Sequence, residues 1–269
     1  MLAEAPARGI VTVEPFEALD RYYNDKASAL NWDCVFVLPP WIRAWWPLFG
    51  KHRESYMAVV RHQDRVTGIA PLMVSGDTVR LVGCSDLTDY GDFIVAPGQG
   101  PQFFRTLLEH LRSEGFRRLD TGRMRADAPT IGELEAQACR AGMDVCCERA
   151  DVLYEMALPA TWDDYLSFLS GKERHEVRRK LRRLHRAGEI SLRVVEDRND
   201  VPDAIASFME LFRMNTPEKV RFMTARKETF FRRLAGEMAG AGLLKLFFLD
   251  LEGSAVAATM CFDHRSTVY

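Results

Sequence analysis

Alternating apolar and polar positions between residues 56 and 83 predict three β-strands. The segments YMAVVRH, RVTGIAPLMVSG and TVRLVG are separated by short polar or glycine-containing pairs at 63–64 and 76–77, as in an antiparallel meander. The next segment, LTDYGDFIVAPG at 87–98, is predicted as a further strand and is dense in aspartate and aromatic residues. The first half of the chain is therefore expected to contain an antiparallel sheet.

Apolar side chains spaced by three or four residues predict helices on either side of these strands. Residues 14–30 and 101–113 each carry such an apolar side. A tryptophan-rich helix is expected to begin at Pro39 and to end at Gly50. The first half is completed by a strand at 116–124, a helix at 130–142 and a strand at 152–159.

The second half repeats this order of elements. It contains a basic helix at 172–186, a strand at 190–196, helices at 201–212 and 225–241, and a hairpin at 242–263 that turns at Glu252-Gly253. The fold class predicted is α+β, with two tandem lobes at 1–160 and 161–269. The sequence stops at Tyr269 within a predicted strand, so we expect a truncated second lobe or a partner copy that completes the sheet.

The basic helix carries a concentrated positive charge. Residues 172–186, KERHEVRRKLRRLHR, hold eight Lys and Arg against two Glu, a formal charge of about +6. Val177, Leu181 and Leu184 fall at i, i+4 and i+7, so one narrow apolar stripe would be buried. A solvated helix surface is one interpretation. We favour an anion site, since adjacent arginines repel one another and the phosphates of a cofactor, a nucleic acid or a membrane would bind them.

The composition is that of a soluble globular protein, with 47% apolar and 28% charged residues among 269. Because the net charge is −2, the protein as a whole does not attract nucleic acid, and any such binding would be confined to the basic helix. No apolar run approaches the roughly 18 residues of a membrane span, and residues 1–13 lack the core of a secretory signal, so a cytoplasmic protein is expected. The absence of G-x-S-x-G and P-loop motifs argues against hydrolases and nucleotidases.

The six cysteines, at 34, 84, 139, 146, 147 and 261, show no CxxC pair and no matching histidine spacing. They are predicted to be reduced thiols, most of them buried, and no metal site is expected. A nucleophilic cysteine has no local support in the sequence.

Several stretches of the chain resemble a known family. The segment from GKERHEVRRKLRRLHRAGEISLRVVE through FRRLAGEMAGAGLLKLFFLDLEGSAVAATMCFDH looks like the BioF2-like acetyltransferase domain, a branch of the GNAT superfamily related to the FemAB aminoacyltransferases. WIRAWWPLFG, TGIAPLMV and LTDYGDFIV resemble the amino-terminal half of the same proteins, which are also described as CelD-like. The resemblance covers most of the chain from Trp41 onward.

The resemblance implies two tandem GNAT-like lobes, the second truncated, with acetyl-CoA or another acyl-CoA as donor. The acceptor would be an amine, for example on a cell-envelope or polysaccharide precursor. One alternative is a FemAB-like transferase that uses aminoacyl-tRNA, and another is a non-catalytic protein that binds nucleic acid or lipid through 172–186. GNAT enzymes hold the donor pyrophosphate in a loop of pattern [Q/R]xxGx[G/A], and APGQGP at 96–101 departs from that pattern.

Acyl transfer to an amine needs a base for the ammonium, a donor to the oxyanion and an acid for the departing thiolate. Asp89 and Asp92 are candidates for the base and the amine anchor, and Tyr90 is the candidate acid, because they lie together beside a glycine-rich turn. The alternative is that the aspartates cap turns and that Tyr90 packs in the core.

Further candidates concern binding. Donor phosphates or an anionic acceptor are expected at four arginines of the basic helix, namely Arg178, Arg179, Arg182 and Arg183. Trp46 lies off the apolar stripe of its helix and is a candidate pocket residue. Lys219 and Arg221 resemble in position the acceptor loop of the family. A core position for Trp46 and a solvated loop for the other two are the alternatives.

Overall fold

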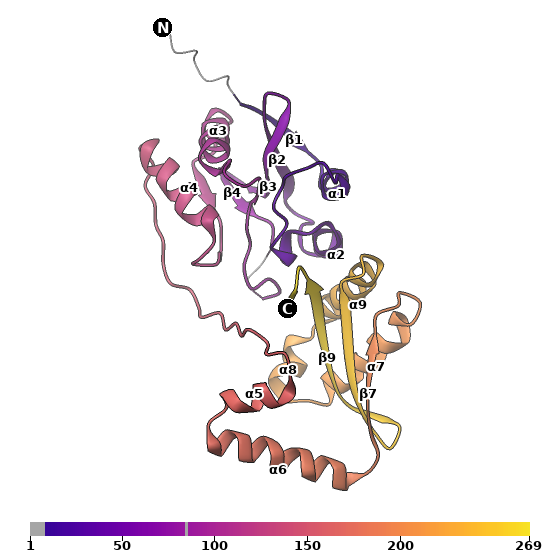
Figure 1. The fold of residues 1–269 in the computed structure, drawn as a ribbon. Helices are drawn as coiled ribbons and strands as arrows, with labels where there is room; N and C mark the ends of the chain where they lie inside the picture. The colour runs from indigo at the N-terminus through magenta and orange to yellow at the C-terminus, as the bar shows by residue number, and fades with distance from the viewer. Residues whose placement is uncertain (1–8, 84–85) are drawn as a thin grey trace. The chain divides into compact units, whose positions relative to one another are not determined.

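The computed structural model describes residues 9–83 and 86–269 and has an α+β fold built on two sheets (Figure 1). Its contacts divide the chain into two compact units. Unit 1 comprises Met1–Ala150 and Thr229–Met238, and unit 2 comprises Asp151–Glu228 and Ala239–Tyr269. The α+β class predicted from the sequence is confirmed.

Unit 1 is organised around a sheet of order β1-β2-β3-β4-β6, and a short strand, β5, also pairs with β3. Neighbouring strands are antiparallel except β4 and β6, which run parallel. The predicted meander corresponds to β2, β3 and β4, and both residues of its first turn, Gln63 and Asp64, have the positive φ that a tight hairpin requires. The strands are β1 (Ile10–Glu14), β2 (Glu54–His62), β3 (Arg65–Ser75), β4 (Thr78–Leu81), β5 (Ile94–Val95) and β6 (Arg118–Asp120).

Helices cover both faces of this sheet. Figure 1 shows α1 and α2 on one face and α3 and α4 on the other. Because neither face is left to solvent, the central strands can be apolar at consecutive positions, as the fully buried run 57–59 is. The helices are α1 (Leu19–Asn24), α2 (Pro39–Phe49), α3 (Gly100–Ser113) and α4 (Pro129–Arg140), with 3-10 helices η1 (Phe16–Ala18) and η2 (Val35–Val37).

One core cluster of unit 1 lies between α3 and the sheet. Phe103, Phe104 and Leu107 of α3 are fully buried and join Ala58 of β2 in one cluster. Gly68 of β3 makes this packing possible, because a Cβ at that position would lie 2.5 Å from the Phe103 ring. The core therefore fixes α3, and the loop that precedes it, against the middle of the sheet.

Unit 2 contains an antiparallel sheet of order β10-β9-β8-β7. Its buried face includes Leu246 and Phe248 of β8, and α7, which buries Ile205 and Met209, packs against β9. The elements are α5 (Trp162–Phe168), α6 (Gly171–Ala187), β7 (Ile190–Val195), α7 (Val201–Arg213), α8 (Pro217–Phe222), β8 (Leu244–Leu251), β9 (Ser254–His264) and β10 (Thr267–Val268). Helix α9 (Ala225–Gly240) is divided between the units, because Thr229–Met238 belongs to unit 1 and the two ends of the helix belong to unit 2.

The two sheets share one order of strands. In each, an opening strand is followed by helices and then by three antiparallel strands, so that β1, β2, β3 and β4 correspond in order to β7, β8, β9 and β10. The central hairpin turns at Gln63-Asp64 in unit 1 and at Glu252-Gly253 in unit 2. The repeat predicted from the sequence is present in the order of the strands, and α5 and α6 precede the repeated part of unit 2.

Four expectations for individual elements are wrong. The helix predicted at 14–30 is preceded by an unpredicted strand, β1, and its α-helical part is only Leu19–Asn24. The strand predicted at 87–98 is a loop except for β5. Residues 152–159 form no strand. The segment that contains Lys219 was expected to be a loop but forms a helix, α8.

Helix α6 is the predicted basic helix, and both of its ends are defined by side chains. Ser170 and Glu173 form a capping box at its start, in which each side chain binds the other residue's backbone N–H. Gly188 ends it with φ of 151°, and a Cβ there would collide with the Glu252 carboxylate. That carboxylate accepts a hydrogen bond from the Glu189 N–H across 2.7 Å, so the end of α6 is tied to the β8–β9 turn.

None of the helices in the described part of the chain is both long and apolar enough to cross a bilayer. Helix α6 has 17 residues, but its basic composition excludes it from that role.

Candidate active site

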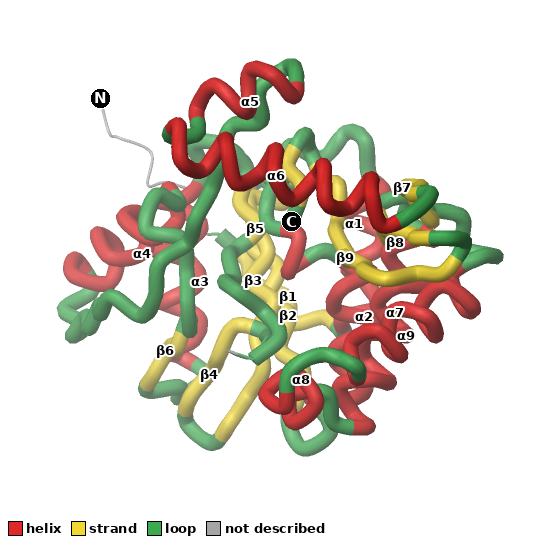
Figure 2. Tube along the Cα trace, turned by 90° about the horizontal axis from the view of Figure 1, so that it is seen from below, coloured by secondary structure: helices red, strands yellow, loops and turns green. Residues whose placement is uncertain are grey.

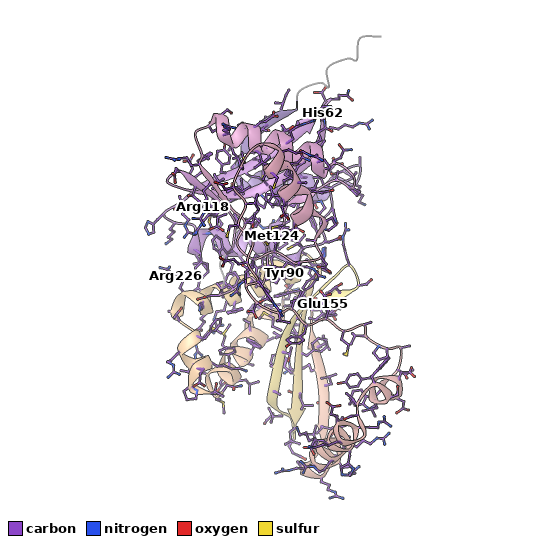
Figure 3. All side chains as sticks on the ribbon, turned by 90° about the vertical axis from the view of Figure 1, so that its left-hand side faces the viewer. His62, Tyr90, Arg118, Met124, Glu155 and Arg226 are labelled. Atoms are coloured by element: carbon purple, nitrogen blue, oxygen red, sulfur yellow. The ribbon has the colours of Figure 1, made fainter. Side chains whose placement is uncertain are left out.

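The predicted catalytic residues Asp89, Tyr90 and Asp92 lie in the loop between β4 and β5 of unit 1. In Figure 3, Tyr90 lies beside Met124 at the end of unit 1 that is remote from His62. The Gly91 N–H donates to the Arg123 carbonyl across 2.8 Å, which joins this loop to the segment between β6 and α4. The loop is thus supported by backbone contacts with a second segment.

Asp92 is oriented by two hydrogen bonds to one carboxylate oxygen. Thr130 Oγ1 donates to Asp92 Oδ1 across 2.5 Å, and the Phe93 N–H donates to the same atom across 2.8 Å. Thr130 is buried in the first turn of α4, so the carboxylate is anchored to a regular element. Within the described residues no hydrogen-bond donor contacts Asp92 Oδ2.

Burial raises the pKa of Asp92 above its ordinary value. The hydrogen bonds from Thr130 and Phe93 and the charge of Arg125 act in the opposite direction, whereas the charge of Asp33 adds to the effect of burial. A carboxylate with a raised pKa is a better proton acceptor than an exposed aspartate.

Tyr90 forms part of a buried aromatic cluster beside Asp92. Its ring packs edge-on against Phe36 with centroids 5.0 Å apart, and Phe36 packs in the same way on Trp41 at 4.8 Å. The Arg125 guanidinium lies 5.7 Å from the centroid of the Tyr90 ring. The site thus combines an oriented carboxylate, an aromatic wall and a nearby cation. Asp89, in contrast, is exposed.

The thiol of Cys34 lies under this loop, with Sγ 4.0 Å from the Tyr90 carbonyl. Burial raises the pKa of Cys34 to about 12, so it is a protonated packing residue at neutral pH. The expectation that most cysteines are buried is wrong, since Cys139, Cys146 and Cys147 are exposed. No group of three or more His, Cys, Asp or Glu side chains in the described ranges is placed to hold a metal ion.

Residues 171–269 match the Acetyltransferase (GNAT) domain. The match begins at the first residue of α6 and extends over β7 to β10, which is less than half of the chain.

Among solved structures, the chain is similar to a tandem GNAT protein from the clavulanic acid biosynthesis pathway, determined without AcCoA. The TM-score is 0.35 at 12% identity, over 94% of this chain and 74% of that one. No curated protein matches the chain.

In unit 1 the position of the GNAT pyrophosphate loop is taken by a segment that departs from the expected pattern. That loop, Ala96–Pro101, leads into the N-terminus of α3. A Cβ at Gly100 would collide with the Glu133 carboxylate of α4, which therefore lies against the first turn of α3. A carboxylate there repels a phosphate. This loop does not suit a pyrophosphate, and no step of the reaction is assigned to it.

The four arginines expected to bind phosphates are all exposed on α6 in unit 2. Arg179 makes a bidentate ion pair with Glu176, with Nη2 to Oε1 at 2.7 Å and Nε to Oε2 at 2.8 Å. Arg178, Arg182 and Arg183 have no carboxylate partner among the described residues. These three cations remain open to an anionic ligand.

The remaining candidates are packing or surface residues. The Trp46 ring packs edge-on against Phe16 at 4.9 Å and covers Gly50 at the end of α2. Lys219 and Arg221 are exposed on α8, where the Lys219 ammonium lies 5.6 Å from the Phe212 ring centroid and Arg221 pairs with a glutamate of the same helix. Lys219 and Arg221 belong to unit 2, whereas Trp46 and Asp92 belong to unit 1.

Two residues of the candidate site were missed by sequence reasoning, Thr130 and Arg125. Neither belongs to a motif, and both reach the Asp92 loop only through the tertiary fold. Thr130 follows Pro129 at the start of a predicted helix. A polar side chain in the first turn of a helix can form a hydrogen bond outside that helix, and this is the one local signal for the role of Thr130.

Proposed function

We propose that this protein is an acyltransferase that transfers an acyl group from acyl-CoA to an amine. The observation that carries the proposal is the match of residues 171–269 to the acetyltransferase domain. The shared strand order of the two sheets supports a tandem arrangement in which unit 1 has the same layout.

Asp92 is the proposed general base. Its Oδ1 is held by Thr130 and Phe93, so Oδ2 would accept the proton of the acceptor ammonium while the freed amine attacks the thioester carbonyl. The donor supplies the activated carbonyl and a thiolate leaving group. Tyr90, the candidate acid for the departing thiolate, lies beside Arg125, whose positive charge would favour the ionised form of Asp92.

The acceptor class follows from the resemblance noted in the sequence, and we propose an amine on a cell-envelope or polysaccharide precursor. The test is a CoA-release assay with acetyl-CoA and a panel of amines that includes amino sugars, diamines and amino-acid amides. Amine-dependent release of CoA, with an acetylated product seen by mass spectrometry, is the expected result. Release that no amine accelerates, with no product, would contradict the proposal.

A further inference from the structure

One side of α6 is a continuous basic surface. At 3.6 residues per turn, Arg178, Arg182 and Arg186 form a ridge at i, i+4 and i+8, and Arg183 and Lys172 extend it around the helix. All five side chains are exposed. The ridge is about 12 Å long by the rise of an α-helix, which is longer than one pyrophosphate requires.

The described residues do not neutralise this surface. The carboxylates of α6 are Glu173, which binds the Ser170 N–H, and Glu176, which pairs with Arg179 at 2.7 Å and lies 3.9 Å from Lys180. No ion pair joins a described carboxylate to any arginine of the ridge. Like charges held so close together raise the free energy of the folded helix unless an anionic partner is present.

An aromatic side chain repeats every third residue on the preceding helix. Trp162, Tyr165 and Phe168 stand at i, i+3 and i+6 of α5, and Trp162 and Tyr165 are in ring contact at 5.2 Å. Trp162 is 53% exposed and Phe168 is 77% exposed, whereas Leu166, one turn after Trp162, is buried. Exposed Trp and Phe side chains on one side of a helix commonly mark an interaction surface.

Helices α5 and α6 are held together by hydrogen bonds at the turn between them, and residues 162–187 are called the α5–α6 corner. The Arg174 guanidinium of α6 binds the carbonyls of Leu166 and Leu169 at the end of α5, at 2.8 and 3.1 Å. Ser170 caps α6 directly after that turn. Figures 1 and 2 both show α5 beside the N-terminal half of α6. Helix α5 therefore lies next to the end of α6 at which the basic surface begins, at Lys172.

We infer that the α5–α6 corner docks on a membrane surface that carries anionic lipid headgroups. Interfacial helices combine Lys and Arg on one side with Trp, Phe and Leu on another, and both features are present here. The apolar stripe of α6 is also only half-buried, so it could contribute to insertion. A nucleic acid would explain the cations but not the exposed Phe168 beside the half-buried stripe. This inference does not depend on acyl transfer.

The test is co-sedimentation of the full chain with phosphatidylcholine vesicles that contain 0 or 30% phosphatidylglycerol. Binding is expected only to the anionic vesicles, and it should weaken at high salt. The triple variant R178A/R182A/R186A should lower the partition coefficient roughly 100-fold, because each cation near such a surface contributes roughly fivefold. Its control, R112A/R117A/R140A, makes the same change in net charge at exposed sites of unit 1 and should bind like the wild type.

Tryptophan emission gives a second readout. Of the five tryptophans, Trp32, Trp41 and Trp45 are buried and Trp46 is half-buried, which leaves Trp162 as the exposed one. Anionic vesicles should shift the emission to shorter wavelength, and W162F should abolish the shift. The inference would be overturned by equal sedimentation of both triple variants, by a lack of vesicle binding, or by binding of RNA or CoA that needs the ridge while vesicles are ignored.

Discussion

Thr130 and Asp92 are joined by a 2.5 Å hydrogen bond although 38 positions of sequence separate them. The bond ends on Oδ1, which also accepts the Phe93 N–H. An asparagine at position 92 could keep both bonds through its amide oxygen while losing the ability to accept a proton. The contact therefore allows the chemistry of Asp92 to be separated from its structural role.

We expect Asp92→Asn to lower kcat by about 100-fold or more, because general-base catalysis contributes roughly 10² to 10⁴ in rate. Thermal stability at neutral pH should be unchanged or higher, since the variant no longer buries a carboxylate whose ionised form is disfavoured by burial. The matched control is Asp89→Asn in the same loop, at an exposed site, which should stay within twofold of the wild type. Full activity of the Asp92 variant would exclude it as the base.

The pH dependence of kcat/KM should show the raised pKa of Asp92. A base must be ionised to act, so activity should rise with pH as Asp92 loses its proton, at a pH above that of an ordinary aspartate. Thr130 favours the ionised form, and Thr130→Val should therefore move the acidic limb to higher pH, whereas Thr130→Ser should leave it in place. A uniform loss of activity without displacement of the limb would mean that Thr130 has only a structural role.

The loop around Asp92 also shows why part of the fold could not be predicted. The apolar and aromatic pattern of residues 87–98 is that of a strand, yet Gly91 donates its N–H to Arg123 and Asp92 binds the Phe93 N–H with its own side chain. The backbone N–H groups of Gly91 and Phe93, which could pair with a neighbouring strand, thus form hydrogen bonds within loops instead. The hairpins, in contrast, combine period-two patterns with turn residues at the correct spacing, and their positions were predicted correctly.

Gly188 should be the glycine of unit 2 least tolerant of substitution. An alanine there would combine φ of 151° with a collision against Glu252, so we expect Gly188→Ala to lower the free energy of unfolding by about 1 to 3 kcal/mol. Gly132 lies inside α4 with nothing within 4 Å of a Cβ, and Gly132→Ala should raise stability by about 0.5 to 1 kcal/mol. Denaturant titration of both variants is the measurement, and equal effects would contradict the assignment.

Glu14 links β1 to the rest of unit 1 and should make stability depend on acidity. Burial alone would raise its pKa, but hydrogen bonds from Tyr22 and Arg61 and the charge of Arg21 outweigh burial and lower it. A lowered pKa means that the stabilisation is complete above the ordinary value of 4.5 and is lost as the pH falls through the folded-state value.

Glu14→Gln should accordingly cost about 1 to 3 kcal/mol at pH 7, since hydrogen bonds to charged groups are worth that much. The difference from the wild type should shrink between pH 5 and pH 3. Urea unfolding across that range measures it, and a difference that is independent of pH would show that the charge of Glu14 is not involved.

The site itself was only partly predictable. Tyr90 and Asp92 were proposed because a carboxylate and a phenol stood together beside a glycine, and the same argument proposed Asp89, which the fold leaves exposed. Local sequence does not report which side of a loop faces the protein. Thr130 contacts Asp92, and Arg125 contacts Tyr90, only because the tertiary fold places α4 and the segment before it against the β4–β5 loop. No local sequence pattern predicts that placement.

The most direct test of the account is a thermal-shift titration with acetyl-CoA, with free CoA and tRNA as comparisons. We expect a saturable rise in Tm with acetyl-CoA, equivalent to about 2.7 kcal/mol at a hundredfold excess over Kd. The variant R178A/R182A/R186A should show the same rise, because its arginines are assigned to lipid. A Tm that responds to neither acetyl-CoA nor CoA would contradict acyl transfer from CoA, and stabilisation by tRNA alone would replace it with an aminoacyl-tRNA donor.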